Sequence, residues 1–261
     1  MPASTLLRRV ACHGSGPPLV LVHGETGPGI WDLLVEPLAT RFQVLVPVLP
    51  GFWPRDGRVR FSDQMFVDYL ELLRIVMGFE CWSMAGYSLG GRFALNYALQ
   101  HSENTTKLVL GNITGLSNIT PLLAIPGLKG AAPPLMAKML DNSTLGAKLV
   151  ERDFSRRDHP MIPAAGAYFG TLMSKATGRE NYSRIFAGGG TKAKGWPTVL
   201  PGLKVPTQVL WSAEDRTCPV QGAYILKKLL PISELRIVEG LGHMAIYEVP
   251  EFYTFSMLRF L

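Results

Sequence analysis

A serine flanked by glycines occupies the segment Gly86 to Gly90, which reads GYSLG. The apolar run 81–85 precedes this segment, and a helical pattern over 92–100 follows it. A strand that turns sharply into a helix places its central residue at strained backbone angles, and flanking glycines lack the β-carbons that would collide there. The hydroxyl of Ser88 is therefore expected to project above the edge of a sheet, where it can attack an electrophilic carbon. The backbone N–H of Leu89, in the first helical turn, points toward the same space and favours negative charge.

Two later segments supply the groups that a serine nucleophile requires. His243 lies in a glycine-containing loop after the last predicted strand, and Asp215 lies in a loop after the strand before it. An imidazole can accept the proton that the hydroxyl loses during attack, and a carboxylate can hold that imidazole in the required tautomer. Glu214, next to Asp215, is the alternative acid. Of the five histidines, His243 alone follows the acid on the last predicted strand, and the chain order Ser88, Asp215, His243 occurs in one known triad fold.

Short apolar runs position these residues. Runs of about four to eight apolar residues without strict alternation are typical of parallel strands covered on both faces. They occur at 18–22, 42–48, 81–85, 107–111, 207–212 and 235–238. Helical patterns separate them, and the pattern that follows Ser62, a residue suited to cap a helix, repeats its apolar residues at helical spacing. Strands that alternate with helices predict an α/β fold with a doubly wound, mostly parallel sheet.

The interval 116–200 interrupts this alternation. It contains Pro133-Pro134, the run Gly188 to Gly190 and short apolar helical patches. Its methionines and aromatic residues give it too much apolar surface for a solvated linker, which is the alternative interpretation. We therefore expect an inserted helical cap over 116–200 and a core formed by 1–115 and 201–261.

These motifs resemble the α/β-hydrolase fold family, in its serine-nucleophile branch with a cap domain. The resemblance depends on the turn at Ser88, on the segment 23–29 (HGETGPG) after the first buried strand, and on a Gly-His pair before a segment whose end contains Glu248 and Pro250. The resemblance implies that Ser88, Asp215 and His243 form a catalytic triad. The family's alternative position for the acid falls within 112–115, which contains no carboxylate.

The resemblance also assigns an oxyanion hole. In the family, the residue after the His-Gly pair donates a backbone N–H to the oxyanion, and here that residue is Glu25. Leu89 supplies the second backbone donor. We expect the side chain of Glu25 to be a solvated or salt-bridged loop residue rather than a chemical group of the site.

Several reactions remain compatible with this arrangement. The first hypothesis is a serine hydrolase that cleaves a small or medium ester, thioester or lactone through an acyl-enzyme on Ser88. Because HGETGPG also resembles the oxyanion loop of enzymes that cleave vinylogous diketones, a C–C bond hydrolase is an alternative. A cofactor-free haloperoxidase or perhydrolase is another, as is a ligand receptor or lyase without hydrolytic function, since the fold does not decide among them.

Three residues near the expected site are candidate substrate contacts. Arg92, just after the turn, could anchor an acidic substrate or form a salt bridge on the helix. Tyr87 and Trp31 could line the pocket or pack beneath the cap. The sequence leaves both interpretations open for each residue.

The composition of the chain limits which other classes of protein it can belong to. The chain has 261 residues, 47% of them hydrophobic, and a net charge of +6 from basic residues that are spread along it. A nucleic-acid partner is not expected, because such proteins concentrate Lys and Arg on one stripe. No apolar run reaches the about 18 residues of a membrane span, and the N-terminus lacks the apolar region of a signal peptide, so we expect a cytoplasmic protein.

Cofactor motifs do not occur in the sequence. Cys12, Cys81 and Cys218 are an odd set without CxxC spacing, which argues against a disulfide framework and a zinc site. Neither an HExxH motif nor a nucleotide-binding glycine pattern is present. We therefore expect no metal or organic cofactor and a small-molecule acyl substrate as partner; the sequence does not indicate the oligomeric state.

Overall fold

The computed structural model describes residues 3–53, 55–117, 148, 150–189 and 192–261. Its centre is a seven-stranded sheet with the order β1-β3-β2-β4-β5-β6-β7. The strands are β1 (Val10–His13), β2 (Pro18–Val22), β3 (Gln43–Pro47), β4 (Trp82–Tyr87), β5 (Thr105–Gly111), β6 (Thr207–Ser212) and β7 (Ser233–Val238). β1 pairs with β3 in the antiparallel sense and the other neighbouring strands are parallel. The predicted α/β class with a mostly parallel sheet is confirmed.

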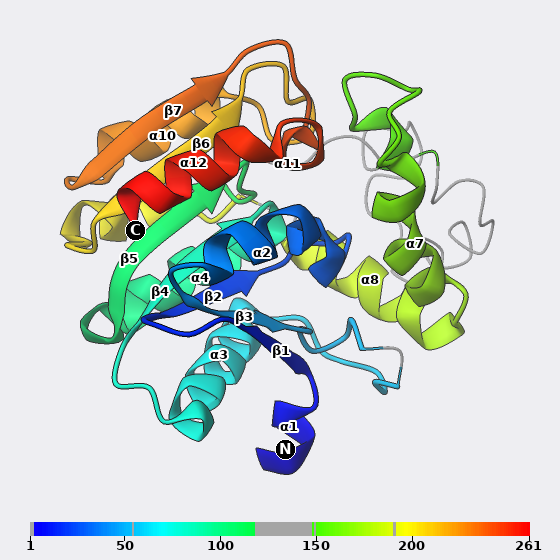
Figure 1. Cartoon of the computed structure of the whole chain (residues 1–261), viewed down its shortest axis with the longest axis horizontal. Helices are drawn as coiled ribbons and strands as arrows, with labels where there is room; N and C mark the ends of the chain where they lie inside the picture. Colours follow the sequence, from blue (N-terminus) through cyan, green and yellow to red (C-terminus); the bar gives the residue numbers. More distant parts are fainter. Residues whose placement is uncertain (1–2, 54, 118–147, 149, 190–191) are drawn as a thin grey trace.

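Helices cover both faces of the sheet (Figure 1). They are α1 (Ala3–Leu7), α2 (Asp32–Ala39), α3 (Asp63–Met77), α4 (Leu89–Gln100), α10 (Gln221–Leu229), α11 (Ala245–Glu248) and α12 (Pro250–Phe260), with short 3-10 turns η1 (Pro28–Trp31), η2 (Ser102–Asn104) and η3 (Leu200–Gly202). α2 contacts α12, and α3 contacts α4. The strand order reverses after β3, so right-handed crossovers place α2 and α3 on opposite faces. Strands buried on both faces explain the nearly continuous apolar runs of β2 and β4.

α3 shows how local sequence sets an element that supports the sheet. The side chain of Ser62 accepts a hydrogen bond from the backbone N–H of Met65 at 3.1 Å, as expected for an N-cap. The helix buries Phe66 and Leu70 on its inner face. Gly78, in the left-handed conformation with φ 75°, ends the helix.

The described part of the interval between β5 and β6 is helical. It contains α7 (Ile162–Met173), α8 (Ala176–Gly189) and α9 (Trp196–Val199). Figure 1 shows α7 and α8 beyond one end of the sheet, away from the helices that cover its faces. Residues 118–147, which belong to the predicted cap, lie outside the described residues. The boundaries 116 and 200 therefore stay a prediction.

Hydrogen bonds connect this interval to loops at the carboxyl ends of the strands. The side chain of Asn181 in α8 accepts from the backbone N–H of Val59 and donates to the carbonyl of Gly57, both at 2.9 Å. The carbonyl of Asp153 accepts from the backbone N–H of Met244 at 2.9 Å. These contacts hold the interval beside the edge of the sheet at which ligands bind in α/β folds.

No helix in the described ranges is long and apolar enough to cross a membrane. All three cysteines are free; Cys12 and Cys81 are exposed, and Cys218 is buried.

Replacing the cap of α3 tests whether this helix is stabilised as described. Ser62→Ala should lower the free energy of unfolding by about 1 kcal/mol, because a backbone N–H of the first turn loses its acceptor. Urea denaturation followed by circular dichroism measures the change. Ser62→Asp, which keeps an acceptor, should unfold close to the wild-type midpoint; an equal loss in both variants would contradict the capping role.

Candidate active site

Ser88 lies at the sharp turn between β4 and α4. Its backbone has φ 52° and ψ −123°, an unfavourable conformation for a residue with a β-carbon. A β-carbon on Gly90 would lie 2.1 Å from the carbonyl oxygen of Val22, and one on Gly86 would lie 2.6 Å from the α-carbon of Gly91. Glycine is therefore required on both sides of the serine, and the turn brings the Ser88 side chain to the edge of the sheet.

The structure brings the three predicted triad residues together. The Oγ of Ser88 lies 2.8 Å from Nε2 of His243, and Nδ1 of His243 lies 2.6 Å from Oδ2 of Asp215. All three residues are buried. Ser88, His243 and Asp215 thus form one unbroken chain of hydrogen bonds across loops that follow β4, β7 and β6.

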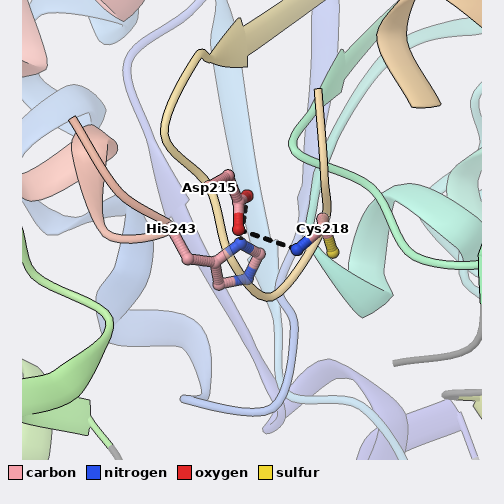
Figure 2. Close-up of side chains that lie close together, drawn as sticks. All are labelled: Asp215, Cys218 and His243. Carbon is pink, nitrogen blue, oxygen red and sulfur yellow. Dashed lines mark hydrogen bonds and ion pairs between the residues drawn. The ribbon is translucent and has the colours of Figure 1, made fainter. Parts of the chain in front are cut away.

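Backbone and side-chain donors hold the carboxylate of Asp215. Its Oδ1 accepts the backbone N–H groups of Thr217 at 2.8 Å and of Cys218 at 2.7 Å. Figure 2 shows Asp215 between the imidazole of His243 and the backbone nitrogen of Cys218. These donors fix the direction of the carboxylate.

Asn112 is a positioning residue that sequence reasoning missed. Its Nδ2 donates to Oδ2 of Asp215 and to Oγ of Ser212, both at 2.6 Å. The hydroxyl of Tyr253 donates to Oδ1 of Asn112 at 3.2 Å. Its backbone has φ 46°, which asparagine tolerates better than most residues. The sequence signal is an amide directly after β5, where the family's alternative acid would lie: an amide there cannot replace the acid but can orient it.

The side chain of Glu25 lies against the nucleophile. Its two carboxylate oxygens are 3.1 and 3.2 Å from Oγ of Ser88, and Oε1 is 3.7 Å from Nε2 of His243. The side chain is 13% exposed. Of the expected alternatives, the structure favours a salt-bridged side chain over a solvated one: the carboxylate lies within the site, and its ion-pair partner is His243.

The loop that carries Glu25 packs tightly on the turn at Ser88. A β-carbon on Gly24 would lie 3.1 Å from Cβ of Ser88 and 3.3 Å from the backbone nitrogen of Leu89. The two expected oxyanion donors, the N–H groups of Glu25 and Leu89, thus belong to segments in close contact.

His23, in the same loop, has the structural role expected of it. Its Nδ1 lies 2.7 Å from the carbonyl oxygen of Gly24, and its Nε2 accepts the backbone N–H of Leu49 at 3.1 Å. Complete burial lowers the pKa of His23 to about 4, against smaller opposing effects of the Gly24 carbonyl and the charge of Glu25. A neutral His23 therefore ties the loop after β2 to the segment after β3.

Two carboxylates control the charge of His243. Burial alone lowers its pKa, but the charge and hydrogen bond of Asp215, together with those of Glu25, outweigh burial and raise the pKa well above its ordinary value. Burial raises the pKa of Glu25, yet the hydrogen bond and charge of His243 bring it below its usual range. The ligand-free site therefore favours an imidazolium between two carboxylates.

The three predicted substrate contacts have other partners. Arg92 is buried and forms two hydrogen bonds to Asp63, at 2.8 and 2.7 Å. Tyr87 is buried and donates its hydroxyl to the carbonyl of His243 at 2.7 Å, so it positions the histidine loop. Trp31 is buried beside Tyr87, with ring centroids 6.5 Å apart. For all three, the geometry favours the packing or salt-bridge alternative.

Glu214, the alternative acid, points elsewhere. Its Oε2 accepts the backbone N–H of Leu241 at 2.9 Å, and the residue is exposed. Asp215 is thus the acid that contacts His243.

One group of side chains within the described residues has the composition of a metal site. Asp215, Cys218 and His243 offer ligand atoms within 4.8 Å of one another. Both oxygens of Asp215 already accept hydrogen bonds, as described above. Burial and the nearby carboxylates raise the pKa of Cys218 well above its ordinary value, so the thiol stays protonated. This group therefore fits the hydrogen-bonded triad better than a metal ion, which binds the thiolate.

Comparisons with known proteins agree with this geometry. Residues 17–250 match the sequence profile of the alpha/beta hydrolase fold family. A 2-hydroxy-6-oxononadienedioate/2-hydroxy-6-oxononatrienedioate hydrolase from Pseudomonas is 27% identical over 95% of this chain and 89% of its own length. An esterase from Thermogutta terrifontis has a similar structure, with a TM-score of 0.80 and 22% identity over 96% of this chain and 91% of its own. The structure of a meta-cleavage product hydrolase from Pseudomonas fluorescens is also similar, with a TM-score of 0.79 and 20% identity over 96% of this chain and 92% of its own.

Removing the charge of Glu25 tests the electrostatics of the site. Glu25→Gln should lower the pKa of His243, because the imidazolium loses one of its two anionic neighbours. The imidazole proton and nitrogen chemical shifts in NMR measure this pKa during a pH titration. Glu36→Gln, which changes an exposed glutamate of α2, is the control and should leave the pKa in place. An unchanged pKa in Glu25→Gln would contradict the ion pair.

Proposed function

The chain belongs to the alpha/beta hydrolase fold family, and from that premise we propose that it is a serine hydrolase that cleaves a small or medium ester, thioester or lactone. The observation that carries the proposal is the hydrogen-bonded chain from Ser88 through His243 to Asp215. A serine hydroxyl is a weak nucleophile unless an adjacent base removes its proton during attack. His243 is within hydrogen-bond distance of that hydroxyl and accepts its proton when the imidazole is neutral.

Acylation begins when Oγ of Ser88 attacks the carbonyl carbon of the substrate. The hydroxyl proton passes to Nε2 of His243, while Asp215 stabilises the imidazolium and remains ionised. The carbonyl oxygen becomes an oxyanion, for which the backbone N–H groups of Glu25 and Leu89 are the donors. Removing one such donor typically reduces turnover by about 10²- to 10³-fold. When the tetrahedral intermediate collapses, the leaving group takes the proton from His243 and the acyl group stays on Ser88.

Deacylation repeats the same proton transfers with water as nucleophile. His243 accepts a proton from the water that attacks the acyl carbon, and a second oxyanion forms at the same donors. Collapse breaks the bond to Ser88, whose oxygen regains its proton from His243. The carboxylic acid product then leaves and the site returns to its initial state.

The interval 116–200 completes the proposal as an inserted cap, with 1–115 and 201–261 as the core. Asp153 supports this assignment, because its carbonyl accepts the backbone N–H of Met244, next to the catalytic histidine. Its carboxylate also accepts the hydroxyl of Thr217 at 3.0 Å. A segment attached at both the histidine loop and the acid loop is suited to enclose the substrate and exclude water.

A C–C bond hydrolase is the second candidate. Two observations favour it: the HGETGPG loop at 23–29 and the similarity to hydrolases named for oxodienoate substrates. A cavity of about 240 Å³ beside His243 is lined by charges of both signs, three arginines (Arg152, Arg157, Arg216) and two acids (Asp153, Glu214). Faster cleavage of a dienol diketone than of any ester would decide for this candidate.

Loss of the nucleophile tests the proposed function directly. A fluorophosphonate probe should form an adduct on the peptide that contains Ser88, identified by mass spectrometry. Ser88→Ala should lower hydrolysis of p-nitrophenyl esters by several orders of magnitude, because the variant lacks the oxygen that lies on His243 and forms the acyl-enzyme. Ser102→Ala, an exposed serine in η2, should retain the wild-type rate. A folded Ser88→Ala variant with unchanged turnover would exclude the mechanism.

A further inference from the structure

The charge balance around Glu25 changes when the site begins to react. His243 must be neutral to accept the proton of Ser88, yet it forms an ion pair with Glu25 only when its imidazole is protonated. Within the described residues, the ion pair of this carboxylate is with His243 and not with an arginine or lysine. When His243 is neutral, the described residues therefore provide no counter-ion for a carboxylate whose side chain is 13% exposed, an arrangement that a cation of the substrate would stabilise.

The position of the carboxylate defines where that cation would lie. Both oxygens of Glu25 are 3.1–3.2 Å from Oγ of Ser88, the atom that bonds to the acyl carbon. In an α-aminoacyl ester the ammonium nitrogen lies two bonds from the acyl carbon, hence about 3 Å from the attacking oxygen. An ammonium group at that distance, on the side of Oγ that faces Glu25, is within reach of the carboxylate for a charge-assisted hydrogen bond.

We propose that Glu25 is a specificity-determining residue that binds the ammonium group of α-aminoacyl esters beside the carbonyl carbon attacked by Ser88. The inference rests on the proposed serine-hydrolase function and names its substrate class. It goes beyond the expected role of this residue, which involves its backbone N–H alone.

The ammonium group is unchanged by the reaction: the bond from Oγ to the acyl carbon forms, the bond to the leaving oxygen breaks, and the proton moves from Oγ through Nε2 of His243 to the leaving group. An ester without the ammonium group must displace the carboxylate with no compensating interaction.

The experiment compares three methyl esters that share a three-carbon acyl chain and differ in the substituent on its α-carbon. They are alanine methyl ester with an ammonium group, N-acetyl-alanine methyl ester with a neutral amide, and methyl propionate with hydrogen. Hydrolysis is followed by proton release at pH 7, where much of the amino ester is protonated. The wild-type kcat/KM should be at least about tenfold higher for alanine methyl ester than for methyl propionate. Glu25→Gln, which keeps the side-chain shape and removes the charge, should abolish this preference and increase the rate with methyl propionate. Glu36→Gln is the matched control and should behave as wild type.

The outcomes distinguish a failure of the ammonium site from a failure of the serine-hydrolase function. If the esters are hydrolysed in a Ser88-dependent reaction and the ratio of kcat/KM values is the same in Glu25→Gln as in wild type, the ammonium site is excluded and the serine hydrolase stands. If none of the three esters, nor p-nitrophenyl acetate, is hydrolysed in a Ser88-dependent reaction, the proposed function fails and the substrate class fails with it. Thermal unfolding of each variant shows whether a lost activity reflects a lost fold.

Discussion

The close approach of two backbone segments at the turn around Ser88 is the constraint on which the site depends. The end of β2 lies so near the start of α4 that a β-carbon on Gly90 would lie 2.1 Å from the Val22 carbonyl oxygen. This contact holds Ser88 at positive φ, a conformation that persists only where the surroundings determine it. It also brings the loop that carries Glu25 to the nucleophile. Loss of these glycines would therefore displace the hydroxyl, the oxyanion donors and the carboxylate together.

Placing the imidazole of His243 between two carboxylates has opposite effects on its two protonation states. Asp215 and Glu25 stabilise the imidazolium of His243, which is the form that follows proton transfer from Ser88. The same charges oppose the neutral form that must exist before transfer. Asp215 is fixed by the N–H groups of Thr217 and Cys218, whereas the carboxylate of Glu25 contacts the side chains of Ser88 and His243. Of the two acids, Glu25 is thus the one that a ligand can move.

The elements and the triad were predictable because their signals are local. Apolar runs identify β2 to β7, since strands buried on both faces need apolar side chains throughout. β1 was missed because its residues are largely exposed at the sheet edge and carry no such pattern. The direction of the Glu25 side chain and the pairing of Arg92 with Asp63 depend on contacts between distant segments. Residue type and spacing do not encode those contacts, so the sequence alone left the roles of these side chains open or misassigned.

Acid quenching during turnover tests the central claim most directly. The protein is mixed with p-nitrophenyl acetate, quenched with acid within the first turnovers, and digested for mass spectrometry. The account predicts an acetyl group on the peptide that contains Ser88, which disappears as the substrate is consumed. Continued hydrolysis with the acetyl group on another residue, or with no acetylated peptide in either wild type or a variant slowed at His243, would contradict it.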